Sequence, residues 1–313
     1  RASDIVPRVR TWPEVKLGKP ALLGFAAYKA GMAHVVVVDD RPTSPFYGKE
    51  VVKAATVLDA PPLYITAFRL YTLNPTNGYK TALGEVWASE LPKDLQRVLT
   101  PPKKTAQLRE ELIEVATEVR ALVATQPRLS GIGKKTPELL EIPIGGVPNI
   151  DERIKYATSI LGKTVSIGEV FTPGQLVDVL AVTKGKGYQG VVKRFGVKIL
   201  PRWHKHRKGH RRTGTIGPQA PALMFTTPRS GQMGFHQRTE YNKRVLKIGE
   251  NGGEVTPKSG FPHYGVVKGP YVLIQGSAPG AVKRLVVLRH PVRPPKKTPP
   301  TTEPQLVWVS TSI

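Results

Sequence analysis

Short apolar runs rich in β-branched and aromatic side chains alternate with glycine and proline in the first 72 residues. This pattern is typical of antiparallel strands joined by turns, and it predicts strands at 21–29, 34–39, 51–59 and 63–71. Similar runs return in the second half of the chain and predict strands at 175–183, 265–268, 271–275, 282–289 and 305–310. The chain is therefore predicted to be mainly β.

The hydrophobic period changes between residues 73 and 163. Over 105–124, leucine and valine recur every three or four residues with glutamates on the opposite face, which predicts an amphipathic helix. A second predicted helix has Asn149 as its N-cap, Asp151 in its first turn and a stop at Gly162. The segment 73–163 is therefore expected to be an α+β insertion.

These elements predict one antiparallel β-barrel whose two halves, 1–72 and 164–290, lie on either side of the insertion at 73–163. Six prolines occur between residues 291 and 304, so we expect 291–313 to form an extended, polyproline-type C-terminal extension. The segment 199–235, inside the second half, is basic and has no clear period.

Charge is concentrated in one part of the chain. The 313 residues hold 47 Lys and Arg against 23 Asp and Glu, a formal net charge of +24. No acidic residue occurs between Asp178 and Glu240, whereas thirteen Lys and Arg do. A packed domain cannot bury so many unpaired cations. We therefore expect the segment 199–235 to project from the core and to bind a polyanion.

The composition also excludes several classes of function. The chain has no cysteine, so it has no disulfides, thiolate zinc sites or cysteine nucleophiles, which fits a reducing cytoplasm. No apolar run approaches the roughly 18 residues of a membrane-spanning helix, and no secretory signal is visible. We expect no membrane role.

Two short motifs resemble phosphate-binding loops. Residues 185–190 match GxGxxG, but a dinucleotide fold needs a helix there and an acidic residue about 20 positions later. The next acidic residue is Glu240. Alternating lysine and glycine would instead let phosphate oxygens approach the backbone N–H groups. Residues 162–164 resemble the end of a P-loop, but Ala157 stands where its first glycine is needed.

Three histidines lie within 203–210, interleaved with Lys and Arg. A metal site is one interpretation, but the cluster contains no carboxylate to support a dication. Contacts of the imidazoles with RNA are favoured. A nuclease would need an acidic base or metal ligand, which could come only from a residue distant in sequence. An RNA-acting enzyme, such as a His-dependent nuclease, therefore stays the alternative function.

Two long stretches resemble a known family. Residues 183–196 (TKGKGYQGVVKRFG) and 231–244 (GQMGFHQRTEYNKR) are similar to two signatures of the large-ribosomal-subunit protein L three family. The stretches 24–32 and 276–284 also fit. The resemblance spans nearly the whole chain and is closest to the archaeal and eukaryotic branch, because of the helical insertion and the stretch 203–212.

The resemblance implies a translation-factor-type barrel with an insertion domain and a long basic finger, 199–235, that enters large-subunit rRNA and approaches the peptidyl transferase centre. It implies roles in subunit assembly and aminoacyl-tRNA accommodation, with rRNA and neighbouring large-subunit proteins as partners. Phe195 stands where Trp is common in the family, and Gln219 stands where archaeal and eukaryotic relatives usually have the Trp of the finger tip. His210 matches a histidine that is methylated in some eukaryotic relatives.

The predicted function is therefore a structural, rRNA-binding component of the large ribosomal subunit in the cytoplasm. No catalytic residue, metal, cofactor or small-molecule substrate is expected. The predicted rRNA-binding residues are the cations, histidines and amides of the two signatures and of the segment between them: Lys184, Lys186, Lys193, Arg194, Lys198, Arg202, Trp203, His204, Lys205, His206, Arg207, Lys208, His210, Arg211, Arg212, Gln219, Arg229, Gln232, His236, Arg238, Lys243 and Arg244.

Overall fold

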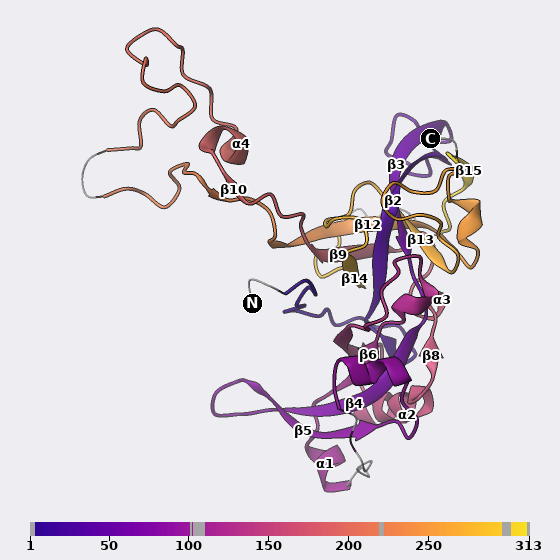
Figure 1. Cartoon of the computed structure of the whole chain (residues 1–313). Coiled ribbons are helices and arrows are strands. Elements are labelled where there is room, and N and C mark those ends of the chain that lie inside the picture. The colour runs from indigo at the N-terminus through magenta and orange to yellow at the C-terminus, as the bar shows by residue number, and fades with distance from the viewer. Residues whose placement is uncertain (1–3, 101, 103–109, 219–221, 296–301, 312–313) are drawn as a thin grey trace.

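The computed structural model describes residues 4–100, 102, 110–218, 222–295 and 302–311. It is mainly β, as predicted, and every pairing between its named strands is antiparallel. Figure 1 shows two regions of sheet, one above the other, and a long loop that projects away from the upper region. Helices are short and few in the described part of the chain.

The upper region contains a seven-stranded sheet with the order β14-β9-β12-β13-β3-β2-β15. Strand β14 also pairs with β2, so the six strands from β14 to β2 form a closed ring, with β15 attached outside it. The bounds of these strands are β2 Gly24–Val38, β3 Glu50–Asp59, β9 Leu176–Val182, β12 Gln237–Gly249, β13 Tyr271–Gln275, β14 Leu285–Arg289 and β15 Leu306–Val309.

The lower region contains a six-stranded sheet with the order β1-β7-β6-β4-β5, in which β8 also pairs with β4. Its strands are β1 Ala21–Leu22, β4 Leu63–Leu73, β5 Lys80–Trp87, β6 Glu118–Ala124, β7 Leu139–Gly145 and β8 Thr164–Val165. The accompanying helices are α1 Glu110–Val115, α2 Ile150–Ile160 and α3 Ile167–Val170. Short 3-10 turns occupy Lys93–Arg97 and Pro127–Leu129 in this region, and Gly252–Glu254 between β12 and β13 of the upper region.

The second predicted helix is confirmed as α2. The Asn149 side chain accepts a hydrogen bond from the Asp151 backbone N–H at 3.0 Å, as its N-cap role requires. Ile154, Ala157 and Ile160 are buried on one face, which packs beside β6 and β7. Local capping chemistry and the hydrophobic period therefore agree with the tertiary structure.

The other predicted helix, over 105–124, is wrong in its second half. Helix α1 ends at Val115, and residues 118–124 form strand β6 between β4 and β7, with residues 103–109 outside the described part. Val119, Ala121 and Val123 are fully buried at a spacing of two. A short apolar run fits either period, and the neighbouring strands decided between them.

Several strand predictions also need correction. The runs at 21–29 and 34–39 belong mostly to the long strand β2, which continues through a register shift between Lys29 and Gly31. Residues 265–268 form no strand, only an isolated bridge at Gly265. Strands β5, β6, β7 and β12 were not predicted. Strand β4, placed by sequence in the first barrel half, pairs with β5, β6 and β8 in the other sheet.

The largest core cluster spans both sheets. It joins Phe25 and Tyr28 of β2 with Phe68 of β4, Ile142 of β7 and Leu288 of β14, all nearly inaccessible. A second cluster lies between the distal halves of β2 and β3 and the segment 255–273. Within the projecting loop, Val191 alone of the described residues is buried.

Candidate nucleic-acid interface

The projecting loop comprises residues 183–236, which connect β9 to β12 (Figure 1). Its two arms are joined by β10 (Tyr188–Gln189) and β11 (Gly231–Gln232), which pair antiparallel. Helix α4 (Val191–Phe195) follows β10 on the outgoing arm. At the root, the Thr183 backbone N–H donates to the His236 carbonyl at 2.9 Å, so the β9–β12 ladder continues into the loop.

A tight pair of turns holds the arms together just beyond the root. The Lys186 N–H donates to the Met233 carbonyl and the Met233 N–H donates to the Gly187 carbonyl, both at 2.9 Å. Gly187 and Gly234 have φ of +66° and +73°, which favours glycine. A Cβ on Gly234 would overlap the Lys184 carbonyl oxygen. Gly234 therefore lets backbone approach backbone here, and Gly187 supplies the left-handed conformation of the facing turn.

Arg194 bridges the two arms from helix α4. Its Nη1 donates to the Arg229 carbonyl at 2.8 Å and its Nε donates to the Gln232 carbonyl at 3.2 Å. The guanidinium also lies 5.0 Å from the centre of the Phe195 ring. Two donors of Arg194 therefore hold the opposite arm in place, while its predicted contact with rRNA stays a prediction.

The outer part of the loop contains the predicted basic finger, 199–235. The Leu200 N–H donates to the His210 carbonyl at 2.9 Å, which closes a lobe that carries the histidine cluster. Further out, Thr213 Oγ1 donates to the Pro228 carbonyl at 3.0 Å and links the arms again. Trp203 is 74% exposed. The loop is thus held by backbone and hydroxyl contacts rather than by an apolar core.

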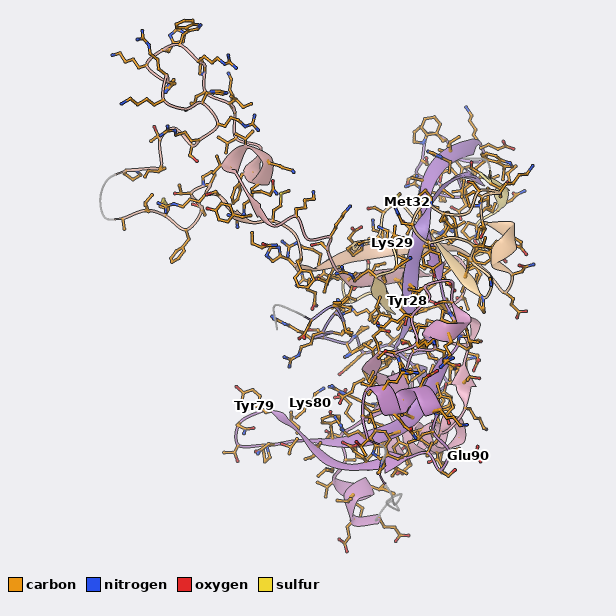
Figure 2. All side chains as sticks on the ribbon, viewed as in Figure 1. Tyr28, Lys29, Met32, Tyr79, Lys80 and Glu90 are labelled. Atoms are coloured by element: carbon orange, nitrogen blue, oxygen red, sulfur yellow. The ribbon has the colours of Figure 1, made fainter. Side chains whose placement is uncertain are left out.

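The charge of the loop is not compensated by the rest of the protein. None of the thirteen cations between Asp178 and Glu240 pairs with a carboxylate in the described part of the chain. By contrast, Arg69 and Arg120 in the lower sheet share Glu141. Figure 2 shows nitrogen-tipped side chains spreading outward from the loop. Their positive potentials add, so the loop attracts polyanions.

The family assignment follows from a match over the whole chain. The profile of the family described as "Ribosomal protein L3" matches residues 1–313. The chain belongs to the ribosomal protein L3 family. The two signature stretches of the sequence form the root of the projecting loop in the structure, where β10 pairs with β11.

Curated relatives of this L3-family chain are named "Large ribosomal subunit protein uL3". One from Pyrobaculum aerophilum is 82% identical over 315 residues, which cover 99% of this chain and 93% of the relative. One from Caldivirga maquilingensis is 57% identical, with 99% and 92% covered. One from Archaeoglobus fulgidus is 50% identical, with 95% and 89% covered. The similarity therefore extends over nearly the full length of both chains.

Most of the predicted site residues of this L3-family chain lie exposed on the projecting loop or at its junction with β12. The exposed ones are Lys184, Lys186, Lys193, Lys198, Arg202, Trp203, His204, Lys205, Arg207, Lys208, Arg211, Arg212, Arg229, Gln232, His236 and Arg238. Arg194, His206, His210 and Lys243 are partly buried. Gln219 lies outside the described residues. The structure thus brings together most of the predicted set, while their contact with RNA stays a prediction.

Arg244 is a correction to the predicted set. Its side chain is 7% exposed, and Nη1 donates to Asp40 Oδ1 at 2.7 Å. Nε also donates to the Gly174 carbonyl at 3.3 Å. This ion pair lowers the pKa of Asp40, chiefly through the hydrogen bond from Arg244. Arg244 therefore stabilises the fold and is not presented to a ligand. Its neighbour Lys243 pairs with Glu240 at 2.7 Å.

The histidine cluster does not form a metal site with the described residues. No group of three or more His, Cys, Asp or Glu suited to a metal ion occurs among them. His204 and Lys205 have φ of 59° and 66°, a left-handed pair that turns the chain sharply at the lobe. The cluster shapes the lobe and presents His204 to solvent.

Sequence reasoning missed two residues at the root. Arg284 donates to the Val182 carbonyl at 3.2 Å and lies 5.8 Å from the centre of the Phe235 ring. Burial lowers the pKa of Arg284. Tyr188 is 74% exposed, and its hydroxyl hydrogen-bonds to Ser230 Oγ at 2.7 Å across the arms. Both lie in stretches that carried the resemblance, but nothing in their spacing distinguished them.

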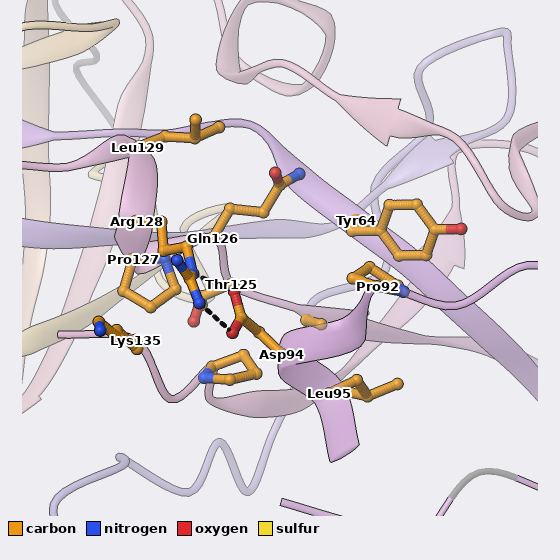
Figure 3. Close-up of a pocket in the computed structure, with 12 residues that line it drawn as sticks. Tyr64, Pro92, Asp94, Leu95, Thr125, Gln126, Pro127, Arg128, Leu129 and Lys135 are labelled. Atoms are coloured by element: carbon orange, nitrogen blue, oxygen red, sulfur yellow. Dashed lines mark hydrogen bonds and ion pairs between the residues drawn. The ribbon is translucent and has the colours of Figure 1, made fainter. Parts of the chain in front are cut away.

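A separate pocket lies in the lower region, far from the loop in sequence (Figure 3). It encloses about 170 Å³ between the turn at Pro92–Leu95 and the segment 124–137. Arg128 Nη2 donates to Asp94 Oδ1 at 2.8 Å at its rim, and this pair lowers the pKa of Asp94. Its walls combine apolar residues, among them three prolines and two leucines, with polar and charged ones. Arg128 and Lys135 line the pocket together with Asp94, which pairs with Arg128, so the pocket lacks the uncompensated charge of the projecting loop.

No helix among residues 4–100, 102, 110–218, 222–295 and 302–311 is long and apolar enough to cross a membrane.

Proposed function

We propose that this chain is a structural component of the large ribosomal subunit and binds large-subunit rRNA through its projecting loop. The observation that supports this most is the set of thirteen cations without carboxylate partners in the described structure, twelve of them on the projecting loop and Arg238 at the start of β12. Membership of the ribosomal protein L3 family and the names of the relatives give the RNA its identity. The protein then acts in the cytoplasm as part of the subunit.

The physical basis of binding is the neutralisation of phosphates. Lys and Arg on the loop displace counterions condensed on RNA, and the released ions supply free energy that falls as salt rises. The fold contributes by holding the two arms through Arg194, Tyr188 and Thr213, so that the cations keep their spacing. Phosphate contacts position the protein, and base contacts add selectivity.

The finer assignment rests on the resemblance. The basic finger, 199–235, reaches toward the peptidyl transferase centre, supports subunit assembly and affects aminoacyl-tRNA accommodation. The closed ring of six strands supports a translation-factor-type barrel. The proposed domains are the barrel halves, 1–72 and 164–290, the insertion at 73–163 and the extension at 291–313. Sheet pairing assigns β4, within the first half, to the sheet of the insertion.

The test is the salt dependence of rRNA binding by the full chain. With about 6–10 phosphate contacts, raising salt from about 50 to 200 mM should weaken binding roughly 10³- to 10⁵-fold. Replacing Lys205, Arg207 and Lys208 together by Ala should lower the slope of log affinity against log salt by about 2 to 3.

A matched control removes the same charge from the lower region. Lys93, Lys135 and Lys155 are exposed and lie in the segment 85–155, where charges balance. Their combined replacement by Ala should change the slope by less than about 1. Equal slopes for the two triple variants, or binding by the wild type that is independent of salt, would contradict the proposal.

The alternative function, an RNA-acting enzyme that uses the histidine cluster, receives no support from the comparisons. It makes a different prediction, because an enzyme would cleave free RNA with a bell-shaped pH profile. Co-sedimentation with large subunits and intact RNA after incubation are the expected results. Cleavage that is lost in His206→Ala would support the enzyme instead.

A further inference from the structure

An open hollow lies between the two arms of the projecting loop, beside helix α4. Its volume is about 460 Å³. Tyr188 lines it from the outgoing arm, and Pro228 and Arg229 line it from the returning arm. Arg211, Arg212 and Ile216 complete it from the outer part of the loop. Pockets for small organic ligands measure about 300–1,000 Å³, so the hollow is larger than a single phosphate needs.

The walls of the hollow combine two kinds of surface. Tyr188, Ile216 and Pro228 present an aromatic ring and apolar groups, while Arg211, Arg212 and Arg229 present guanidinium groups. Unpaired RNA bases bind to aromatic faces by stacking, and guanidinium groups bind phosphate oxygens. An RNA nucleotide contains both a planar base and a phosphate. A phosphate alone would leave the aromatic wall unused.

The aromatic wall is positioned before any ligand binds. The Tyr188 hydroxyl hydrogen-bonds to Ser230 Oγ at 2.7 Å, which fixes the ring at one end while 74% of the residue stays exposed. Arg194 holds the Arg229 backbone through its carbonyl at 2.8 Å. The Arg212 guanidinium donates to the Lys208 carbonyl at 2.5 Å. A wall held in this way loses little conformational entropy on binding.

We propose that this hollow binds a single unpaired nucleotide of RNA, with its base stacked on Tyr188 and its phosphate held by the arginines. The proposal rests on the proposed function and adds a base-dependent contact to the charge-dependent binding by the loop. A base inside a duplex is stacked and cannot enter a recess, so the nucleotide comes from a loop or bulge.

The first step of the test identifies the bound nucleotide and then removes the aromatic ring of Tyr188. Large-subunit rRNA carrying photoreactive 4-thiouridine is cross-linked to the full chain, and the nucleotide joined to the hollow is identified. Tyr188→Leu then removes the aromatic face but keeps an apolar side chain. At fixed salt it should weaken binding of the rRNA fragment roughly 5- to 150-fold, with an unchanged salt slope. Tyr188→Phe keeps the ring and should bind within about threefold of the wild type.

The decisive step couples the protein and the RNA. An abasic site at the cross-linked nucleotide removes the base but no phosphate, so it should weaken wild-type binding as much as Tyr188→Leu does. Combining the two changes should cause little further loss, because both remove the same contact. Arg238 is exposed outside the hollow, and Arg238→Ala should lower the salt slope by about 1 and add fully to the abasic change.

Three results would overturn the nucleotide site: Tyr188→Leu binds like Tyr188→Phe, its effect adds fully to that of the abasic site, or the cross-linked nucleotide is base-paired. If the wild type still binds rRNA with the expected salt dependence, these results overturn only the nucleotide site and leave the proposed function intact. Wild-type binding that is absent or independent of salt would instead overturn the proposed function.

Discussion

Gly234 at the root of the projecting loop offers a direct test of how the two arms are held. Its φ is +73°, and a Cβ there would overlap the Lys184 carbonyl oxygen. Gly187 in the facing turn has φ of +66°, but a Cβ on it would meet nothing within 4 Å. Gly187→Ala therefore introduces backbone strain alone. Gly234→Ala introduces the same strain together with a steric overlap.

The magnitudes follow from these geometries. An Ala residue in the left-handed region costs about 1–2 kcal/mol, which is the whole expected effect of Gly187→Ala. In Gly234→Ala the turn must also open, which breaks the two 2.9 Å hydrogen bonds between Lys186, Met233 and Gly187. Each such bond contributes about 0.5–1.5 kcal/mol, so the total is roughly 2–5 kcal/mol.

Amide hydrogen exchange at Lys186 and Met233 measures this opening directly, because both N–H groups bond across the arms. Exchange should be about 5- to 30-fold faster in Gly187→Ala and at least about 30-fold faster in Gly234→Ala. Core amides of β13 should be unchanged in both variants and serve as the internal control. Equal exchange in the two variants, within about threefold, would refute the idea that close backbone approach explains the second glycine.

Three further outcomes test other parts of the molecule. Burial lowers the pKa of His290 from 6.5 to about 4, so the unfolded chain binds the extra proton between these values. The free energy of unfolding should then fall by about 3 kcal/mol as pH drops from about 7 to 4. Urea melts of His290→Gln should lack this part of the pH dependence. Superimposable pH profiles for the wild type and the variant would refute this account. Arg244→Met removes the ion pair with Asp40 and should cost about 1.5–3 kcal/mol, the usual contribution of hydrogen bonds to charged groups, with an unchanged rRNA salt slope. A lower slope at full stability would restore Arg244 as a phosphate contact. Arg194→Lys keeps the charge but cannot bridge both carbonyls, so the amide hydrogens that bond across the arms should exchange about tenfold faster, with an unchanged salt slope of rRNA binding. Lys193→Ala should instead lower this salt slope by about 1 and leave the amide exchange unchanged.

The elements that the sequence predicted well are those whose signals are local. Helix α2 follows from the Asn149 cap and a 3.6-residue period, both contained within a dozen residues. Strands β3, β9 and β13 likewise lie close to their apolar runs. Residues 118–124 show the limit, because their apolar positions fit a helix as well as a strand. Burial between β4 and β7 selected the strand, and both of these strands lie outside the run 105–124 whose period was considered.

For the candidate site, too, some features follow from the sequence and others only from the fold. The thirteen cations without an acidic residue are a property of the sequence, and together with the missing hydrophobic period they predict that the segment 199–235 projects from the core. Which cations stay free is a property of the fold. Arg238 and Arg244 lie on the same strand, β12, yet Arg238 is exposed and Arg244 is buried against Asp40, 204 positions away in sequence. Ion pairing acts through space over a few ångströms. The tertiary structure therefore decides which charges remain available to RNA.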